Sequence, residues 1–272
     1  MCSSDLVRWG ELTSIKNIAG ALVAESAVRG AMMAARGLTG PLEALDHRGG
    51  LHQVFDPRLD FSRLWAPASG PPRILLSHVK TWPCIGTGQT AVGAAIELHP
   101  KLAGRTDSIE KIVVTMMDAP MIRDQQAEES RRLPRTHEDA DHSFTFLPVV
   151  AMVDGDVGER QFEHERWMTP QIRGLIEKVD LRVSRELGLK APGSMPCHIR
   201  VMLAGGETLE AECLYPPGHT FTDRGLDEGV VEWKFRRCAE GALSNGVIDQ
   251  IIGALGAANG AKTPADVAAL LC

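Results

Sequence analysis

The spacing of apolar residues changes twice along the chain, and this change is the strongest constraint on its fold. Over residues 13–36, small and apolar side chains recur at helical spacing behind a capping residue, Thr13 or Ser14, which predicts one tightly packed helix. The sequence Gly37-Leu38-Thr39-Gly40-Pro41 should end that helix. Pro41 then suits the first turn of a short helix through Asp46, because proline needs no amide partner there.

The middle of the chain alternates between strand and helix patterns. Residues 66–72 hold three prolines and a glycine and are typical of a linker. Beyond it we expect helices at 90–98, 142–153 and 170–179, strands at 109–116 and 179–183, and a hairpin of strands 198–203 and 207–214 around Ala204-Gly205-Gly206. Pro148 should bend the second helix or mark its early turn. Helical spacing then returns at 227–243, at 245–255 and from 263 onward.

These patterns predict an α+β fold. Residues 1–74 and 219–272 would belong to a helical domain, interrupted by an inserted α+β domain at residues 75–218. A chain of 272 residues is long enough for one large domain or two smaller ones, each with its own core.

Composition and charge narrow the classes of partner. The net charge is −6 and no run of Lys or Arg occurs, which argues against a nucleic-acid binder, since phosphate neutralisation needs clustered basic side chains. We find no apolar stretch that approaches the ~20 residues needed to cross a bilayer, so we expect no membrane contact and a cytoplasmic location. The six cysteines form no CxxC pair and should be ordinary buried or surface thiols.

Two segments carry residues that could bind a ligand. The sequence Ile85-Gly86-Thr87-Gly88-Gln89 resembles a phosphate-binding loop, but Pro83 stands where a strand should lead into it, so a glycine-rich turn before a helix is the better interpretation. Residues 137–142, HEDADH, concentrate possible metal ligands, although adjacent residues seldom give the geometry of a metal site. We interpret them as a solvated loop before a helix and predict no metal.

Three side chains are candidates for acid–base chemistry or anion binding. Lys16 lies in the first turn of an otherwise apolar helix, and Lys80 precedes Thr81-Trp82-Pro83 at a domain junction. A lysine in partly apolar surroundings can hold a carboxylate or move a proton, whereas a solvated ammonium on a packed stem is the alternative. His142 lies where a polar loop meets an apolar helix, so its imidazole either faces a cleft or is a hydrogen-bonded structural group.

Several stretches, in order over most of the chain, carry a resemblance to known proteins. They are Gly10-Glu11-Leu12-Thr13-Ser14-Ile15-Lys16, Gly37–Pro41, Gly49–Leu51, Lys80-Thr81-Trp82-Pro83, Gln89–Ala95, Asp139–Phe146, Ala151–Gly155 and Tyr215-Pro216-Pro217-Gly218-His219. Together these stretches resemble the MmgE/PrpD family, which includes 2-methylcitrate dehydratase and cis-aconitate decarboxylase. The resemblance implies a helical domain with a smaller α+β lid domain, a homodimer, and no metal or organic cofactor.

The resemblance also implies a chemistry. Family members act on tricarboxylic or related acids, removing a proton next to a carboxylate with loss of water, or losing a carboxylate. It implies that Lys16 and Lys80 bind substrate carboxylates or transfer protons, that His142 is catalytic, and that Gln89 and Phe146 belong to the substrate-binding site. We therefore expect a carbon–oxygen lyase, a hydro-lyase of the 2-methylcitrate dehydratase type that serves propionate metabolism.

The chain departs from the decarboxylase pattern at two positions. Phe146 stands where decarboxylase-like members have a tyrosine, and Ile85 replaces a histidine. Decarboxylase or epimerase activity, or a non-catalytic binding or assembly module, are the alternatives to the dehydratase.

The beginning of the sequence bears on activity. The first six residues, MCSSDL, equal the translation of a common sequencing-adaptor DNA read from a GTG start, and the resemblance places further helices and catalytic histidines before Glu11. We expect a C-terminal fragment that is inactive alone and exposes apolar faces at Ile18, Leu22 and Met33.

Overall fold

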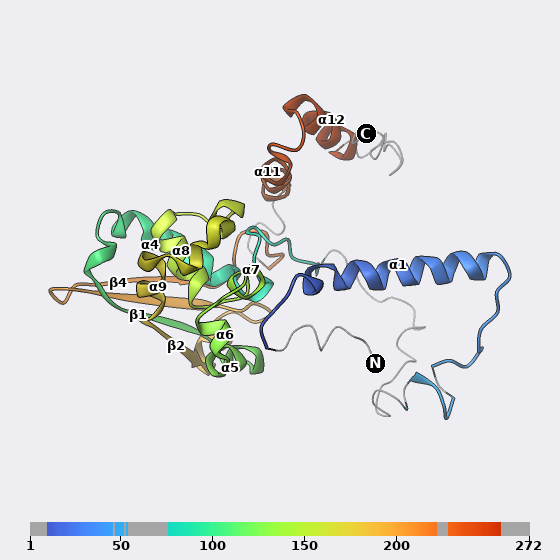
Figure 1. Ribbon diagram of the computed structural model, residues 1–272, viewed down its shortest axis with the longest axis horizontal. Coiled ribbons are helices and arrows are strands. Elements are labelled where there is room, and N and C mark those ends of the chain that lie inside the picture. The colour runs from blue at the N-terminus through green and yellow to red at the C-terminus, as the bar shows by residue number, and fades with distance from the viewer. Residues whose placement is uncertain (1–9, 46, 52, 54–75, 222–227, 257–272) are drawn as a thin grey trace. The chain divides into compact units, whose positions relative to one another are not determined.

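The computed structural model describes residues 10–45, 47–51, 53, 76–221 and 228–256 (Figure 1). It divides the chain into two compact units, Met1–Leu76 and Ser77–Cys272, and each is described by itself. Helices predominate, and one mixed sheet of four strands lies in the second unit, so the predicted α+β class is confirmed. The predicted three-part division at residues 74 and 218 stays a prediction, and the expected linker at 66–72 lies outside the described residues.

The first unit contains one long helix, α1 (Ile15–Ala35), close to the predicted bounds. Ser14 occupies the N-cap position without a side-chain cap bond. The expected short helix after Pro41 is wrong: residues 42–45 form a turn, because the chain folds back and Leu51 N donates to Ala44 O at 2.9 Å.

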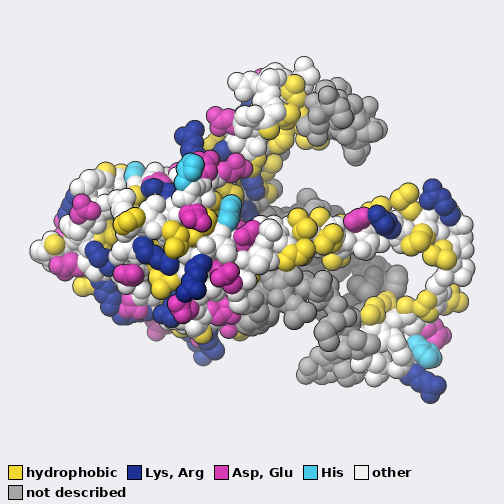
Figure 2. Space-filling model, in the orientation of Figure 1, with side chains coloured by type: hydrophobic (Ala, Val, Ile, Leu, Met, Phe, Trp, Pro, Cys, Tyr) yellow, Lys and Arg dark blue, Asp and Glu magenta, His cyan; other side chains and the backbone are white. Residues whose placement is uncertain are grey.

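The expectation that α1 is tightly packed is also wrong, whereas the expected exposure of its apolar residues is confirmed. None of its residues is buried, and Ile18, Leu22 and Met33 are about half exposed, at 49%, 47% and 49%. Figure 2 shows hydrophobic side chains along this helix. The apolar residues are spread around the helix rather than gathered on one side, a pattern typical of helices that are covered all round.

α1 also corrects the expectation about membrane-length segments. Its 21 residues contain an 18-residue stretch with a mean hydropathy of 1.3, enough in length and composition for a bilayer span. The same values fit a core helix of a soluble protein. Glu25 and Arg29 form an ion pair of 2.7 Å within α1, and charged side chains are costly inside a bilayer.

The second unit is built on a sheet with strand order β2-β1-β3-β4. The strands are β1 (Ile109–Met117), β2 (Val179–Ser184), β3 (Cys197–Leu203) and β4 (Thr208–Cys213). β1 pairs with β2 in parallel and with β3 antiparallel, and β3 and β4 form the predicted hairpin around Gly205 and Gly206. Both glycines have positive φ, which this tight turn requires.

Helices cover one face of this sheet, as Figure 1 shows for α4, α8 and α9. α4 contacts β3, β4 and α8, and α8 contacts α9. The helices of the unit are α4 (Gln89–Leu102), α5 (Pro120–Ala127), α6 (Glu129–Arg132), α7 (His137–Ala140), α8 (Phe146–Asp154), α9 (Pro170–Ile176), α10 (Arg185–Lys190), α11 (Glu228–Ala239) and α12 (Asn245–Gly256). Short 3-10 segments are η3 (Gly86–Gly88), η4 (Thr106–Ser108) and η5 (Glu159–Met168).

The strands alternate between buried apolar and exposed polar residues. In β1, Ile112, Val114 and Met116 are fully buried, and in β3 Ile199 and Val201 are fully buried. The opposite face carries ion pairs between neighbouring strands, among them Lys111 with Asp180 and Arg200 with Glu210. A mixed sheet with one covered and one polar face follows from this alternation.

Two helix boundaries differ from the expected ones for local reasons. α8 begins at Phe146 rather than at 142, because residues 141–145 form turns in which the Ser143 hydroxyl accepts from Phe146 N at 3.1 Å; Thr145 occupies the N-cap position. Pro148 falls in that first turn, where a missing N–H costs little. α9 ends at Ile176 because Lys178 O pairs with Ile112 N at 3.0 Å, as the chain enters β2.

Residues 137–142 are not the solvated loop that we expected. They contain α7, and Asp139 is fully buried beside the buried Arg131, with Nη1 and Oδ1 3.1 Å apart. A buried carboxylate needs such a charged partner, because its transfer out of water is otherwise very unfavourable.

We predict that Arg131→Met lowers the free energy of unfolding by about 3–5 kcal/mol, because it leaves a buried carboxylate without its cation. Urea denaturation followed by tryptophan fluorescence measures this. The double variant Arg131→Met/Asp139→Leu should recover most of the loss. As a control, Arg182→Met removes an exposed ion pair with Asp180 and should change stability by at most about 1 kcal/mol. Equal effects of Arg131→Met and Arg182→Met would contradict the prediction.

We also predict that the exposed apolar residues of α1 cause self-association. Light scattering after size-exclusion chromatography should give a mass above that of one 29.4-kDa chain. Ile18→Glu/Leu22→Glu should lower that mass, whereas glutamates at the polar positions Asn17 and Ser26 should not. A monodisperse monomer for the unmodified chain would contradict this expectation.

Candidate functional site

Lys80 lies at the start of a tight turn that precedes α4. Its side chain is exposed, whereas Thr81 and Trp82 directly after it are buried. The indole of Trp82 lies against Gly93 of α4, where an added Cβ would be 3.6 Å from the ring. Cε of Lys80 passes close to Gly86, 3.7 Å from where a Cβ would stand. The turn is therefore anchored by buried residues, and it exposes the Lys80 ammonium group to solvent.

Gln89, the first residue of α4, binds this turn from inside. Its Oε1 accepts from the backbone N–H groups of Thr81 and Trp82, at 2.8 and 3.0 Å. Its Nε2 donates to Trp82 O at 3.0 Å and to Cys84 Sγ at 3.1 Å. The Gln89 side chain is buried, and the hydrogen bonds of its carboxamide hold the backbone of residues 81–84 in this turn.

A second segment holds the same turn from the other side. Val79 N donates to Gly218 O at 3.0 Å, and the Thr81 hydroxyl donates to Pro217 O at 2.6 Å. Gly218 has φ of +80°, and a Cβ there would lie 2.5 Å from Val79 O. Only glycine allows the two segments to approach so closely.

Two imidazoles stack beside this contact. The rings of His78 and His219 have centroids 3.7 Å apart and an interplanar angle of 20°. His219 is buried; its Nε2 lies 3.2 Å from Gly193 O and its Nδ1 accepts from Phe221 N at 3.1 Å. These bonds fit a neutral imidazole. Burial, together with the neighbouring His78, lowers the pKa of His219 below its usual 6.5.

His142 lies in the turn between α7 and α8. It is half-buried, and its Nδ1 contacts Glu138 O at 3.1 Å and the Asp141 carboxylate. Asp141 O accepts from Ile85 N at 2.8 Å, so this turn adjoins the one that follows Lys80. A carboxylate on Nδ1 fixes the ring and makes Nε2 the basic nitrogen. Together with Lys80, the two turns place a cation and an Asp–His pair in one part of the second unit.

Phe146 lies in the hydrophobic core. Its side chain is fully buried and contacts the rings of Phe162 and Trp167, at centroid distances of 5.9 and 6.4 Å. Packing alone accounts for a phenylalanine at this position. Its role in substrate binding stays a prediction, as does that of Gln89.

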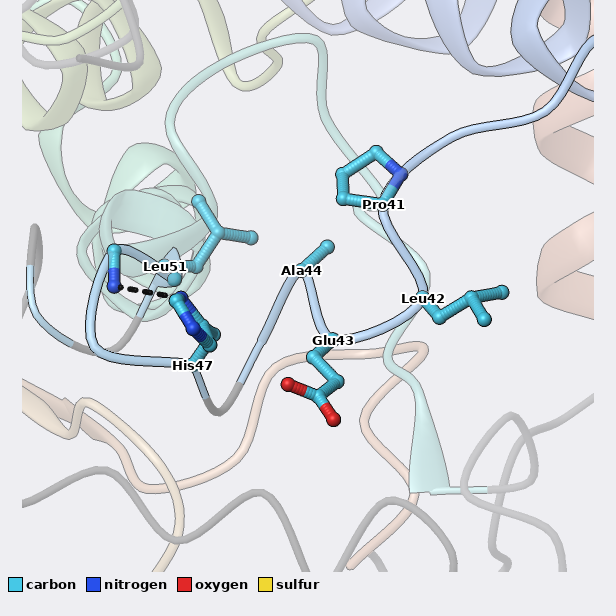
Figure 3. A pocket seen from close by; sticks show the side chains of 8 residues that line it. Pro41, Leu42, Glu43, Ala44, His47 and Leu51 are labelled. Atoms are coloured by element: carbon cyan, nitrogen blue, oxygen red, sulfur yellow. Dashed lines mark hydrogen bonds between the residues drawn. The ribbon is translucent and has the colours of Figure 1, made fainter.

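Lys16 lies in the first unit, at the second position of α1, and is half-buried. Its predicted role alongside Lys80 stays a prediction. The same unit has a hollow of about 630 Å³ that is lined by Pro41, Leu42, Glu43, Ala44, His47, Gly49, Gly50 and Leu51. Figure 3 shows that Glu43 and His47 supply its charged and imidazole groups, and that Gly49 N donates to His47 Nδ1. Backbone and aliphatic groups make up most of the remaining lining.

Cysteine thiols and potential metal ligands are the other groups among the described residues that could carry chemistry. Cys84 is buried, and burial raises the pKa of its thiol to about 12, although Lys80 opposes the rise. Cys197, Cys213 and Cys238 are also free thiols, while Cys2 and Cys272 lie outside the described residues. Within the described part of the chain, no group of three or more His, Cys, Asp or Glu residues is arranged to hold a metal ion.

The glycine-rich stretch forms η3, a turn that leads into α4 without a preceding strand. This arrangement agrees with our interpretation of a helix-initiating turn. Sequence reasoning missed the parts played by Asp141 and His219. Both lie inside stretches that carried the family resemblance, next to His142 and at the end of Tyr215–His219, so their position in those stretches was the available signal.

Comparisons with known proteins agree on one family. Residues 82–254 match the MmgE/PrpD C-terminal domain. Cis-aconitate decarboxylase from Homo sapiens is 24% identical over 240 residues, which cover 84% of this chain and 47% of that protein. The Mus musculus enzyme of the same name is 25% identical over 146 residues, covering 54% of this chain and 28% of that protein. The chain thus spans about half the length, or less, of these curated relatives.

We predict that His219 makes stability depend on pH. Because its folded pKa lies below its unfolded value of 6.5, its contribution is complete above that value and is lost as pH falls through the folded pKa. The free energy of unfolding in urea should therefore decrease between about pH 7 and pH 5, and His219→Gln should reduce this decrease. His164→Gln, at an exposed position, is the control. An unchanged pH dependence in His219→Gln would refute the prediction.

Proposed function

Because the chain belongs to the MmgE/PrpD family, we propose that it forms the C-terminal part of a lyase acting on tricarboxylic or related acids, of the 2-methylcitrate dehydratase type. The observation that carries the proposal is the position of Lys80. Its exposed ammonium extends from a turn that is bound on both sides, next to the turn of Asp141 and His142. A site for a polyanion needs a fixed cation close to a base.

In this proposal lysines bind the carboxylates. An ammonium group acts as a compact charge that can pair with a carboxylate oxygen, and pairing next to the reacting carbon makes its C–H bond more acidic. Lys80 would fill this role in the second unit, and Lys16 in the first. The cytoplasmic location, the homodimer and the action without a cofactor belong to the same proposal.

His142 would transfer the proton. Asp141 orients its ring through Nδ1, so that Nε2 can accept a proton from the carbon next to a carboxylate. The electron pair of that C–H bond then forms the C=C bond as the C–O bond breaks. The departing hydroxide takes up a proton and leaves as water, so the reaction needs no oxidant or reductant.

Decarboxylation is the second candidate. The similarity to the human and mouse enzymes supports it, since both carry the name cis-aconitate decarboxylase. Phe146, buried against Phe162 and Trp167, supports the dehydratase instead, since a phenylalanine supplies no hydroxyl at this position. Substrate assays distinguish the two, because dehydration of 2-methylcitrate gives an alkene without carbon dioxide, and decarboxylation of cis-aconitate releases carbon dioxide.

We predict that Lys80→Ala weakens the binding of citrate and 2-methylcitrate to this chain by at least about tenfold, because it removes a charge-assisted bond to a carboxylate. Isothermal calorimetry measures the affinity, and circular dichroism checks that the variant folds. Lys101→Ala, at an exposed lysine paired with Glu97, should bind like the unmodified chain.

The result that would overturn the proposal is equal binding by Lys80→Ala and the unmodified chain, or no binding of either acid. The second result would favour a non-catalytic module. Turnover should be assayed as well as binding, because the chain spans about half the length, or less, of the curated relatives that it matches.

A further inference from the structure

We propose that Gln89 is a positioning residue for Lys80 rather than a substrate-binding residue; this inference rests on the proposed function of Lys80. The carboxamide of Gln89 binds the backbone of Thr81 and Trp82, the two residues that directly follow Lys80. It therefore acts through the chain and contacts no substrate.

The hydrogen-bonding capacity of the Gln89 side chain is taken up inside the protein. A carboxamide has two N–H donors and an oxygen with two lone pairs. Oε1 accepts from two backbone N–H groups, and Nε2 has Trp82 O and Cys84 Sγ within 3.1 Å and Ile85 O at 3.5 Å. Only 3% of Gln89 is exposed, so its carboxamide offers a ligand almost no accessible surface.

α4, the helix that begins with Gln89, is held rigidly in the core and supports the Gln89 side chain. α4 buries Ala91, Val92, Ala94 and Ala95 completely between the sheet and α8. A helix packed on both sides has little freedom to shift or rotate. The carboxamide at its first turn is therefore fixed in position, and so are the backbone groups that it binds.

The other side of Lys80 is fixed independently. Val79 bonds to Gly218, and Thr81 bonds to both Gln89 and Pro217. The backbone at Lys80 thus lies between two anchored residues, while the side chain alone extends into solvent. Catalysis depends on such placement, since a small displacement of a charged group can lower the rate greatly.

The inference can be tested on the chain as it exists, with Gln89→Met, which keeps the size of the side chain and removes its hydrogen bonds. The Thr81 and Trp82 amide hydrogens should then exchange with solvent about 10- to 100-fold faster, because Gln89 is their acceptor. The methyl signal of ¹³C-dimethylated Lys80, assigned by its loss in Lys80→Arg, should have a smaller nuclear magnetic resonance line width, because the Lys80 backbone is held less firmly. Citrate, added as the probe, should bind at least about fivefold more weakly.

Two variants separate positioning from general destabilisation. Gln89→Glu keeps an acceptor for the Thr81 and Trp82 amides but loses the Nε2 donor to Trp82 O, and should restore part of their protection. Gln126→Met removes the 2.7 Å bond from a different, half-buried carboxamide to Leu181 O, and should leave the Thr81 and Trp82 amides and citrate binding unchanged.

The outcomes distinguish this inference from the proposed function. If the unmodified chain binds citrate, unchanged citrate affinity in folded Gln89→Met overturns the positioning role. If the unmodified chain does not bind citrate, the proposed function fails, and the exchange rates and the Lys80 signal then decide whether Gln89 positions Lys80. Exchange of Thr81 and Trp82 at the unmodified rate in Gln89→Met overturns the inference in either case.

Discussion

Burial of one face of the sheet under α4 and α8 is the constraint on which the second unit depends. Ile112, Val114 and Val201 are fully buried on this face, and the removal of apolar surface from water is the dominant favourable contribution to folding. α4 is held between sheet and α8, so the position of its first turn is set by the core. The Gln89 carboxamide then fixes the turn that carries Lys80 relative to α4, because it accepts hydrogen bonds from the backbone of that turn.

The candidate site combines a fixed backbone with exposed chemistry. Lys80 extends into solvent from buried neighbours, and His142 is oriented by the Asp141 carboxylate. The bond from Ile85 N to Asp141 O connects these two turns, which lie far apart in the sequence. Such an arrangement can bind an anion and accept a proton, which is the chemistry that the family of this chain suggests.

Local patterns predicted most elements of the second unit. The hairpin around Gly205 and Gly206, the strand β1 and the helix α4 all lie close to their expected bounds, because turn chemistry and apolar periodicity act over a few residues. Errors arose where distant contacts decide. The buried state of Asp139 depends on Arg131, and the tight packing expected for α1 depends on residues that would cover it, so neither could be inferred from spacing alone.

The sequence by itself determined the α+β class, the family, and Lys80 and His142 as candidates, since these follow from short-range patterns and ordered motifs. Only the tertiary structure showed that Gln89 uses its carboxamide on the backbone next to Lys80, that Phe146 is part of the core, and that His219 is a buried imidazole stacked on His78. The physical reason is that burial and hydrogen-bond partners belong to pairs of residues that the fold brings together, and no single segment of sequence contains both members.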